Sequence, residues 1–197
     1  MTRGEGLQPA TISRMLWCRT HLGWDADFHV NKVGIDIARS EVVADARKSD
    51  ADYLIMVDDD VVPTERITRL PEHDVPVVSY RSVVDFNEDH SLQQIYAAGG
   101  AMLCIRRDVF MDETQDPLFL FTRNSDGTVA DFGGEDTTFC QRVHKMGHPI
   151  YVDPSVVGEH QPRIELVRTL VENGDDEGIV IASAYNTYDY DVELPVS

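Results

Sequence analysis

Three adjacent aspartates, Asp58, Asp59 and Asp60, are the residues whose type and spacing point most directly to chemistry. They follow the apolar run 53–57 (YLIMV), which predicts a strand buried on both faces of a sheet. The carboxylates are then expected at the carboxyl end of a central strand, where open α/β sheets bind ligands. A divalent ion such as Mg²⁺ or Mn²⁺ neutralises such a group and bridges it to the phosphates of a nucleotide. In a protein this acidic, a solvated loop is the plainer alternative.

A second acidic pair, Glu135 and Asp136, stands at the start of an amphipathic pattern. Apolar residues recur at helical spacing from Phe139 to Met146, and Gly147 supplies a stop, so the spacing predicts a helix over 135–146. The helix dipole favours an anion in the first turn. A carboxylate kept ionised there suits a general base that takes a proton from a hydroxyl. Helix capping is the alternative reading of the same pair.

The elements that must position these acids alternate between strand and helix patterns over the first 80 residues. The sequence predicts a strand over 26–33, a helix over 35–49, a strand over 53–57, a short helix after Pro63 and a strand over 75–80. This alternation is typical of an α/β domain with a mostly parallel sheet.

The second half of the chain is less regular. We expect a strand over 96–105 that Gly99 and Gly100 interrupt, and a loop over 119–133 that turns at Asp126-Gly127. After the helix that begins at Glu135, the patterns predict strands over 150–152 and 156–158, a helix over 164–171, and an acidic tail.

Four segments, in this order and with this spacing, resemble the GT-A-type glycosyltransferases, and most closely glycosyltransferase family 2. The resemblance runs from about residue 27 to residue 160, and its segments are ADYLIMVDDDVVP, GGAMLCIRRDVF, FGGEDTTFCQRVHKMG and IYVDPSVVGEH. It implies a GT-A (nucleotide-diphospho-sugar transferase) fold, Rossmann-like, with a mostly parallel central sheet flanked by helices. This domain is expected to span residues 1–165, and an acidic C-terminal helix and tail to span 166–197.

The resemblance also implies a metal-dependent donor site. In the D-x-D motif, Asp58 is expected to contact the nucleotide ribose or the metal, and Asp60 to ligate the Mn²⁺ or Mg²⁺ that bridges the two phosphates, with Asp59 assisting. His160 matches a histidine that completes the metal shell in a number of GT-A enzymes. The donor is then a nucleotide-diphosphate sugar.

Further residues receive roles on the acceptor side and at the sugar. Asp136 is expected to be the general base of an inverting hexosyltransferase, with Glu135 orienting the acceptor. The pair Gly99-Gly100 lets the backbone pass beneath the donor sugar, with a β-bulge as the alternative. The acceptor hydroxyl belongs to a glycan, a protein or a lipid-linked sugar.

The start of the chain departs from the family pattern. Family members open with a strand whose end contacts the nucleotide base, whereas this chain begins at or after the end of that strand. The first strand is therefore expected to be truncated, and Thr2 and Arg3 are the expected nucleotide contacts.

Composition restricts the partners. The 17 Lys and Arg against 35 Asp and Glu give a formal charge of −18, which argues against nucleic acid or an anionic membrane. Salt adaptation explains such a charge, as does a genomic base composition that favours Arg and Asp codons. The three cysteines are far apart, which argues against a disulfide framework or a zinc cluster. No membrane-spanning or signal segment is visible, so a cytoplasmic location is expected.

Three other functions fit parts of the pattern. A haloacid-dehalogenase-like phosphohydrolase would use Asp58 as nucleophile and Asp60 as acid/base, but it needs a lysine where this sequence has none between Lys48 and Lys145. A glycoside hydrolase would use paired carboxylates without the acidic triplet. A non-catalytic nucleotide-sugar-binding module is the alternative that needs no turnover.

Overall fold

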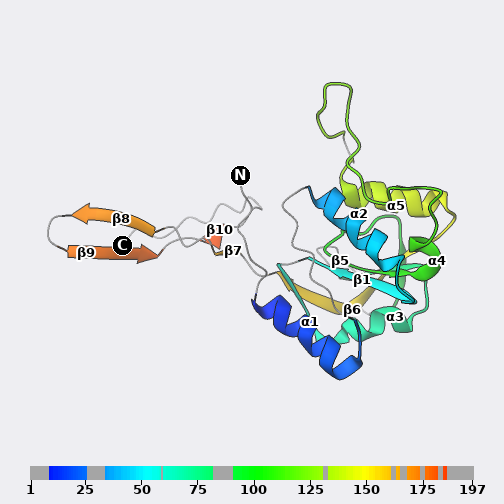
Figure 1. Ribbon diagram of the computed structural model, residues 1–197, viewed down its shortest axis with the longest axis horizontal. Coiled ribbons are helices and arrows are strands. Elements are labelled where there is room, and N and C mark those ends of the chain that lie inside the picture. Colours follow the sequence, from blue (N-terminus) through cyan, green and yellow to red (C-terminus); the bar gives the residue numbers. More distant parts are fainter. Residues whose placement is uncertain are drawn as a thin grey trace.

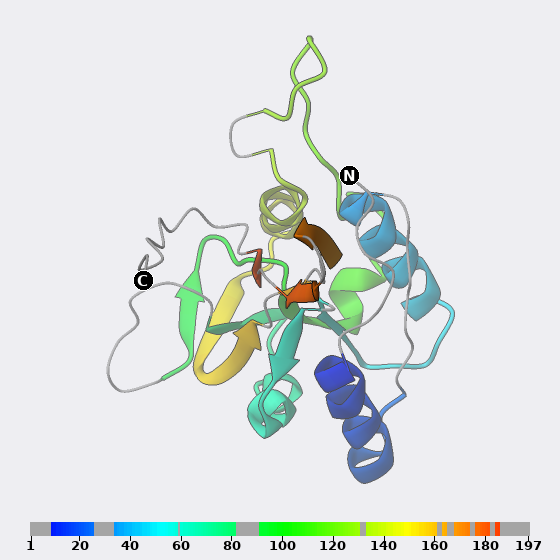
Figure 2. The ribbon, with the colours of Figure 1, turned by 90° about the vertical axis from the view of Figure 1, so that its left-hand side faces the viewer.

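The computed structural model of the chain is shown in two perpendicular views in Figures 1 and 2. It describes residues 9–25, 34–58, 60–81, 91–130, 133–160, 163–164, 168–173, 176–181 and 184–185. The side chains described are those of residues 13–25, 34–58, 60–81, 91–130 and 133–159.

The main sheet has six strands and is built around a long strand, β6 (Ile150–His160). Five strands follow one another in the order β1-β5-β3-β6-β2, and β4 pairs with β6 as well. The bounds of the other five are β1 (Tyr53–Val57), β2 (Val61–Pro63), β3 (Val77–Arg81), β4 (Gln93–Ile95) and β5 (Met102–Arg106).

The strand directions correct the predicted fold class. Among the pairings of this sheet only β3 and β6 run parallel, while β1 with β5, β5 with β3, and β6 with both β2 and β4 are antiparallel. The sheet is mixed and nearly closed into a barrel. The predicted GT-A fold, with a Rossmann-like, mostly parallel sheet flanked by helices, is therefore wrong.

The strand directions were predicted wrongly because an apolar run indicates burial and carries no information on the direction of a strand. The run 53–57 contacts a core cluster on each face of the sheet, although β1 is an end strand in which only Met56 is fully buried. Such a run occurs in a mixed sheet as well as in a parallel one. The direction of β1 is set by its partner β5, which inserts antiparallel between β1 and β3. No local pattern encodes that insertion, because β5 lies about 45 residues beyond β1 in the sequence.

The described helices are few, and alternate strand residues contribute to two core clusters, one on each face of the sheet. On one face, α2 (Ile35–Ala46) and α5 (Glu135–Lys145) contribute to a cluster with Leu103 and Ile105. On the other face, α1 (Pro9–Leu22) contributes to a second cluster with Met102 and Cys104. Figure 1 shows α2 and α5 above the sheet and α1 and α3 below it. The second cluster also includes residues of η1 (Glu65–Thr68) and α3 (Arg69–Glu72).

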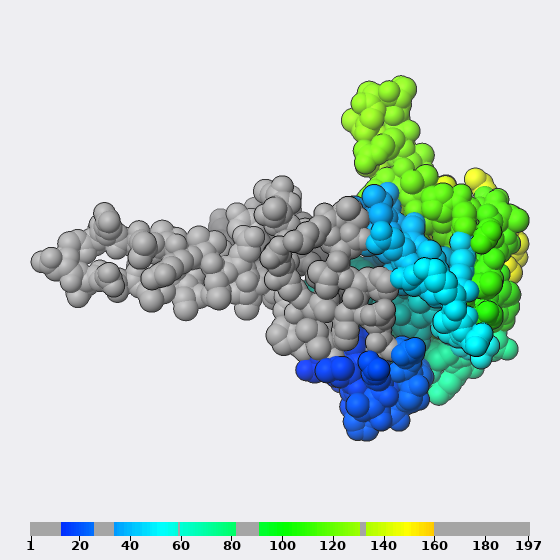
Figure 3. Space-filling model, viewed as in Figure 1, coloured from blue at the N-terminus to red at the C-terminus, as the bar shows by residue number. Residues whose placement is uncertain are grey.

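The loop predicted over 119–133 is confirmed as an irregular hairpin that follows α4 (Arg107–Phe110) and precedes α5. Its limbs meet at the bridge between Arg123 and Val129, and Asn124 donates its backbone N–H to the carbonyl of Thr128 at 2.8 Å. Gly127 turns the tip with φ of 84°, a left-handed conformation that favours glycine. The space-filling view in Figure 3 shows this hairpin standing out from the surface.

Most other local predictions for the first half are confirmed, including α2, β1, the short helix after Pro63, and β3. The predicted strand 26–33 lies outside the described residues, and α1 was not expected from the sequence. In the second half, the two strands predicted over 150–158 are one strand, β6.

The helix predicted over 164–171 is wrong. Those of its residues that the structure describes belong to two strands, β7 (Arg163–Ile164) and β8 (Arg168–Asn173). β8 pairs antiparallel with β9 (Asp176–Ile181), and β7 pairs with β10 (Ala184–Tyr185). Short apolar runs of this kind fit a strand and a helix equally well, and cross-strand pairing decides between them.

Candidate functional site

Arg39, on α2, joins the two acidic motifs. Its Nη1 donates to Glu135 at 2.6 Å, and its Nη2 donates to both carboxylate oxygens of Asp58, at 2.9 and 3.1 Å. The side chains of Arg39 and Glu135 are only 7% and 12% exposed, whereas that of Asp58 is 29% exposed. The buried guanidinium of Arg39 therefore bridges two carboxylates, Asp58 and Glu135, that lie far apart in the sequence.

Backbone hydrogen bonds fix Asp58 at the start of a turn between β1 and β2. Asp58 donates its N–H to the carbonyl of Ala101 at 2.9 Å, and its own carbonyl accepts the N–H of Val61 at 3.1 Å. The first bond places Asp58 directly beside the segment that enters β5. Asp58 and Asp60 thus lie on one tight turn directly after β1, as the sequence predicted, but β1 lies at one end of the strand order and not in the centre of the sheet. Asp59 lies outside the described residues.

The two glycines predicted to underlie the donor have different surroundings. A Cβ added to Gly100 would lie 2.5 Å from Cζ and 2.7 Å from Nη2 of Arg39, and closer still to Nη1. The guanidinium of Arg39 thus packs directly against the backbone of Gly100, where there is no room for a side chain. A Cβ added to Gly99 would meet no atom within 4 Å. Only Gly99 therefore borders open space in this part of the molecule.

The start of α5 presents its two acids differently. Glu135 turns toward Arg39, and its pKa is raised because burial disfavours the carboxylate more than the charge of Arg39 favours it. Asp136 turns back over the first helical turn, where its Oδ1 accepts the N–H of Thr137 at 2.7 Å. Among the described residues, Asp136 forms no ion pair. Asp136 is therefore the acid available to a ligand, while Glu135 is engaged within the protein.

The pairing of β2 with β6 brings His160 to the same place. His160 is the register partner of Val61, the residue directly after Asp60. Partners across an antiparallel ladder have Cα atoms about 4.5–5.5 Å apart, so the backbones of Asp60 and His160 are close neighbours. The side chain of His160 lies outside the part of the chain whose side chains are described.

The donor set fits a hard or borderline divalent ion in its chemistry. Asp60 and His160 would provide the oxygen and imidazole ligands that suit Mn²⁺ and Mg²⁺. Asp60 is half-buried on the turn, whereas Arg39 already occupies both oxygens of Asp58. No group of three His, Cys, Asp or Glu suited to a metal occurs among the described side chains, to which those of His160 and Asp59 do not belong. The predicted nucleotide contacts Thr2 and Arg3 lie outside the described residues.

Arg39 is the site residue that sequence reasoning missed, although the sequence carries a signal for it. The predicted apolar face of α2 includes Ile35 and Val42, and Arg39 is four residues after the first and three before the second. An arginine on the face of a helix that packs against the core needs a buried anion. The two acidic motifs supply two such anions, Asp58 and Glu135.

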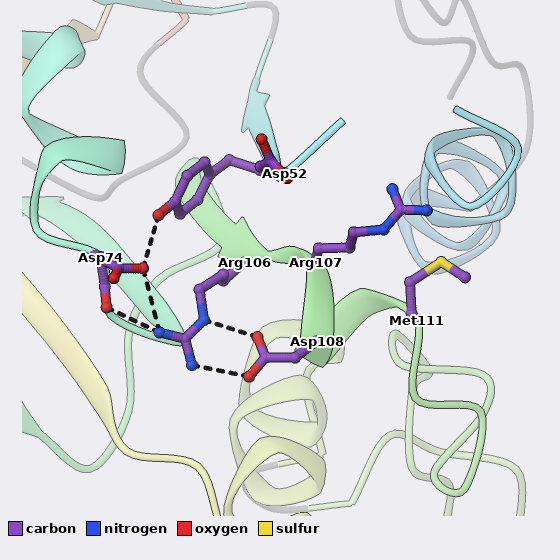
Figure 4. A pocket seen from close by; sticks show the side chains of 7 residues that line it. Asp52, Asp74, Arg106, Arg107, Asp108 and Met111 are labelled. Carbon is purple, nitrogen blue, oxygen red and sulfur yellow. Dashed lines mark hydrogen bonds and ion pairs between the residues drawn. The ribbon is translucent and has the colours of Figure 1, made fainter. Parts of the chain in front are cut away.

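A hollow in the described residues lies elsewhere, at the opposite end of β1 from Asp58 (Figure 4). It measures about 760 Å³, and Arg106 crosses it to pair with Asp108 at 2.8 Å and with Asp74. Tyr53 donates to Asp74 at 2.9 Å, and burial together with this carboxylate raises the pKa of Tyr53 to about 12. Arg106 is paired with Asp74 and Asp108, so these charges neutralise one another. The hollow is therefore a weaker candidate for a reactive site than the cluster of Arg39, Asp58 and Glu135, here called the Arg39 cluster.

None of the helices in the described part of the chain is both long enough and apolar enough to cross a bilayer. No protein-family profile matches the chain, and no curated protein matches it in sequence. Solved structures do share its fold. The crystal structure of A197 from STIV matches with a TM-score of 0.58 and 17% sequence identity, over 90% of this chain and 93% of that chain. At this identity the similarity concerns the fold alone.

Proposed function

We propose that this protein is a metal-dependent glycosyltransferase that moves a sugar from a nucleotide-diphosphate sugar to an acceptor hydroxyl. The observation that carries the proposal is the convergence of Asp58 and Glu135 on Arg39. It brings the turn that holds Asp58 and Asp60, here called the acidic turn, next to the start of α5, although 76 residues lie between Asp58 and Glu135 in the sequence. A donor site and an acceptor base must be neighbours in such a reaction.

The acidic turn is the proposed donor side. Asp60, with His160 beside it on β6, would hold a Mn²⁺ or Mg²⁺ ion, and Arg39 keeps the turn in place through Asp58. When bound, the ion supplies a Lewis acid that stabilises the charge on the departing diphosphate. It also offsets the negative charge of the protein at the one place where a phosphate-bearing ligand must bind.

The start of α5 is the proposed acceptor side. Asp136 would accept the proton of the attacking hydroxyl, because it has no cation partner in the described residues and stands in the first turn of α5, at the end of the helix dipole that favours an anion. Glu135 fixes the first turn of α5 through Arg39, which sets the direction from which Asp136 meets the acceptor. A base on the face opposite the leaving group gives inversion at the sugar carbon. The acceptor is a glycan, a protein side chain or a lipid-linked sugar.

The test is binding and turnover with UDP-, GDP- and dTDP-sugars in the presence of Mn²⁺ or Mg²⁺. Asp60→Ala is expected to abolish metal-dependent binding. Asp136→Asn is expected to keep binding and to lower kcat by about 10²–10⁴-fold, the usual contribution of a general base. Asp45→Asn is the matched control, since Asp45 is exposed on α2 and pairs with Lys48. If no sugar nucleotide binds with metal present, the proposal fails, and binding without turnover in wild type favours a non-catalytic module.

A further inference from the structure

Strand β6 changes partners halfway along its length, and this change is built around a bulge. Its first half pairs with β3 and β4, and its last three residues pair with β2. On β3, Tyr80 is paired with Asp153 but the next residue, Arg81, is paired with Val157. Three extra residues, 154–156, therefore stand between these two pairs. Such a bulge bends a strand and redirects the part that follows it.

The carboxylate of Asp153 lies at the start of this bulge and is 1% exposed. Its Oδ1 accepts the N–H of Ser155, within the bulge, at 2.8 Å. Its Oδ2 lies 2.7 Å from Nε2 of His73 and 3.2 Å from Nε of Arg69. Arg69 begins α3 and His73 directly follows it, so one buried carboxylate both shapes the bulge and ties it to α3. Arg66 adds a bond from η1 to the carbonyl of Ser155 at 3.3 Å.

These contacts require a charged carboxylate at position 153. A carboxylate that is almost completely buried needs several donors. Here His73, the backbone N–H of Ser155 and the guanidinium of Arg69 each supply one. Although burial alone would raise it, the bonds from Ser155 and His73 and the charge of Arg69 hold the pKa of Asp153 below its ordinary value. An uncharged side chain at this position would lose the attraction of Arg69 and weaken the link between bulge and helix.

Beyond the bulge, β6 packs tightly against β2. A Cβ added to Gly158 would lie 2.7 Å from Cγ1 of Val61 and 3.0 Å from Cε of Met102. The register there pairs Pro63 with Gly158 and Val61 with His160. Since Val61 directly follows the acidic turn, the direction in which β6 leaves its bulge determines where that turn lies relative to His160.

We propose that Asp153 is a positioning residue: through the bulge of β6 it holds β2, and with it the acidic turn, against the end of β6. For the metal site this inference rests on the proposed function. Asp153 contacts no reacting group, and it acts through the backbone of residues 154–160.

The experiment compares Asp153→Asn with Asp116→Asn in the full chain. Asp116 is the control because its carboxylate is likewise paired with an arginine: Arg47 donates to it at 2.5 and 2.7 Å on the α2 face of the sheet. Hydrogen exchange is measured in peptides that cover 58–64 and 156–161, with 53–57 as reference. Asp153→Asn should speed exchange at least tenfold in the first two segments and leave the reference unchanged, whereas Asp116→Asn should leave all three unchanged.

Calorimetric titration with Mn²⁺ alone provides the second readout, and Asp153→Asn is expected to weaken binding at least tenfold while Asp116→Asn does not. If Asp153→Asn does not fold, His73→Gln replaces it and should show the same pattern with a smaller change. Unchanged exchange, or a uniform increase in all segments, would overturn the positioning role. If exchange changes as expected but wild type binds no Mn²⁺, the proposed function fails instead, together with the link from Asp153 to a metal.

Discussion

The contact between Gly100 and Arg39 allows the candidate site to be disrupted by a single methyl group. In Gly100→Ala, the new Cβ would overlap the guanidinium, which then has to leave its position between Asp58 and Glu135. Breaking a buried ion pair on one side costs about 3–5 kcal/mol. Because water reaches Asp58, whose side chain is 29% exposed, we expect the lower end of that range, about 3 kcal/mol.

The assay is thermal unfolding followed by circular dichroism. For a chain of this length, 1 kcal/mol corresponds to about 2–4 °C in Tm, so Gly100→Ala should lower Tm by roughly 6–12 °C. Gly99→Ala is the control one residue away, since its Cβ meets nothing within 4 Å. Removing a glycine where there is room stabilises a protein by about 0.4–1 kcal/mol through the unfolded state, so this control should melt slightly higher than wild type.

A double-mutant cycle then tests the cause. In an Arg39→Ala background there is no guanidinium to displace, so adding Gly100→Ala should change Tm by little, and the two substitutions should be strongly non-additive. Equal melting temperatures for the two glycine variants would refute the reasoning. So would additive effects of Arg39→Ala and Gly100→Ala.

Three more predictions concern pH, thiols and salt. Because the folded protein holds the pKa of Asp153 below its unfolded value, this carboxylate adds stability above pH 4 or so, and the stability is lost as the pH falls through the lower folded pKa. Asp153→Asn should therefore flatten the acid limb of a stability curve measured by urea unfolding between about pH 2 and pH 6, and an unchanged acid limb would contradict this. Burial raises the pKa of Cys104 to about 12 and that of Cys140 to about 11, and Cys18 is also buried, so a thiol reagent at pH 8 should label none of the three in the native protein and all three in guanidinium, which mass spectrometry would count. Molar KCl should raise Tm by screening the net charge of −18, and a lower Tm in KCl than in dilute buffer would exclude salt adaptation.

The sequence allowed those elements to be predicted whose patterns are strong over their own length. α5 has acids in its first turn, an apolar face and a glycine stop, and it was predicted to within one residue. β1 is a continuous apolar run and was predicted with its exact bounds. The placement of Asp58 and Asp60 directly after β1 followed from that strand alone.

The remaining features depend on partners far away in the sequence. The direction of β1 depends on β5, and the single strand β6 depends on a bulge whose key group, Asp153, is held by residues of α3. The mostly parallel sheet was wrong because periodicity reports burial and carries no information on pairing. Arg39 was missed because its two anions, Asp58 and Glu135, are 19 and 96 positions away in the sequence and no pattern within α2 identifies them.

The ion pairs of Arg39 also make the candidate site a late product of folding. Glu135 is 96 positions from Arg39, and closing a flexible loop of that length costs about 4 kcal/mol in chain entropy, from the logarithmic dependence on loop length. Contacts so distant in sequence slow folding, and they cannot form on a nascent chain before α5 has been synthesised. Partly folded chains therefore lack the assembled cluster. Any activity that depends on it will measure the fraction of molecules whose whole domain is native.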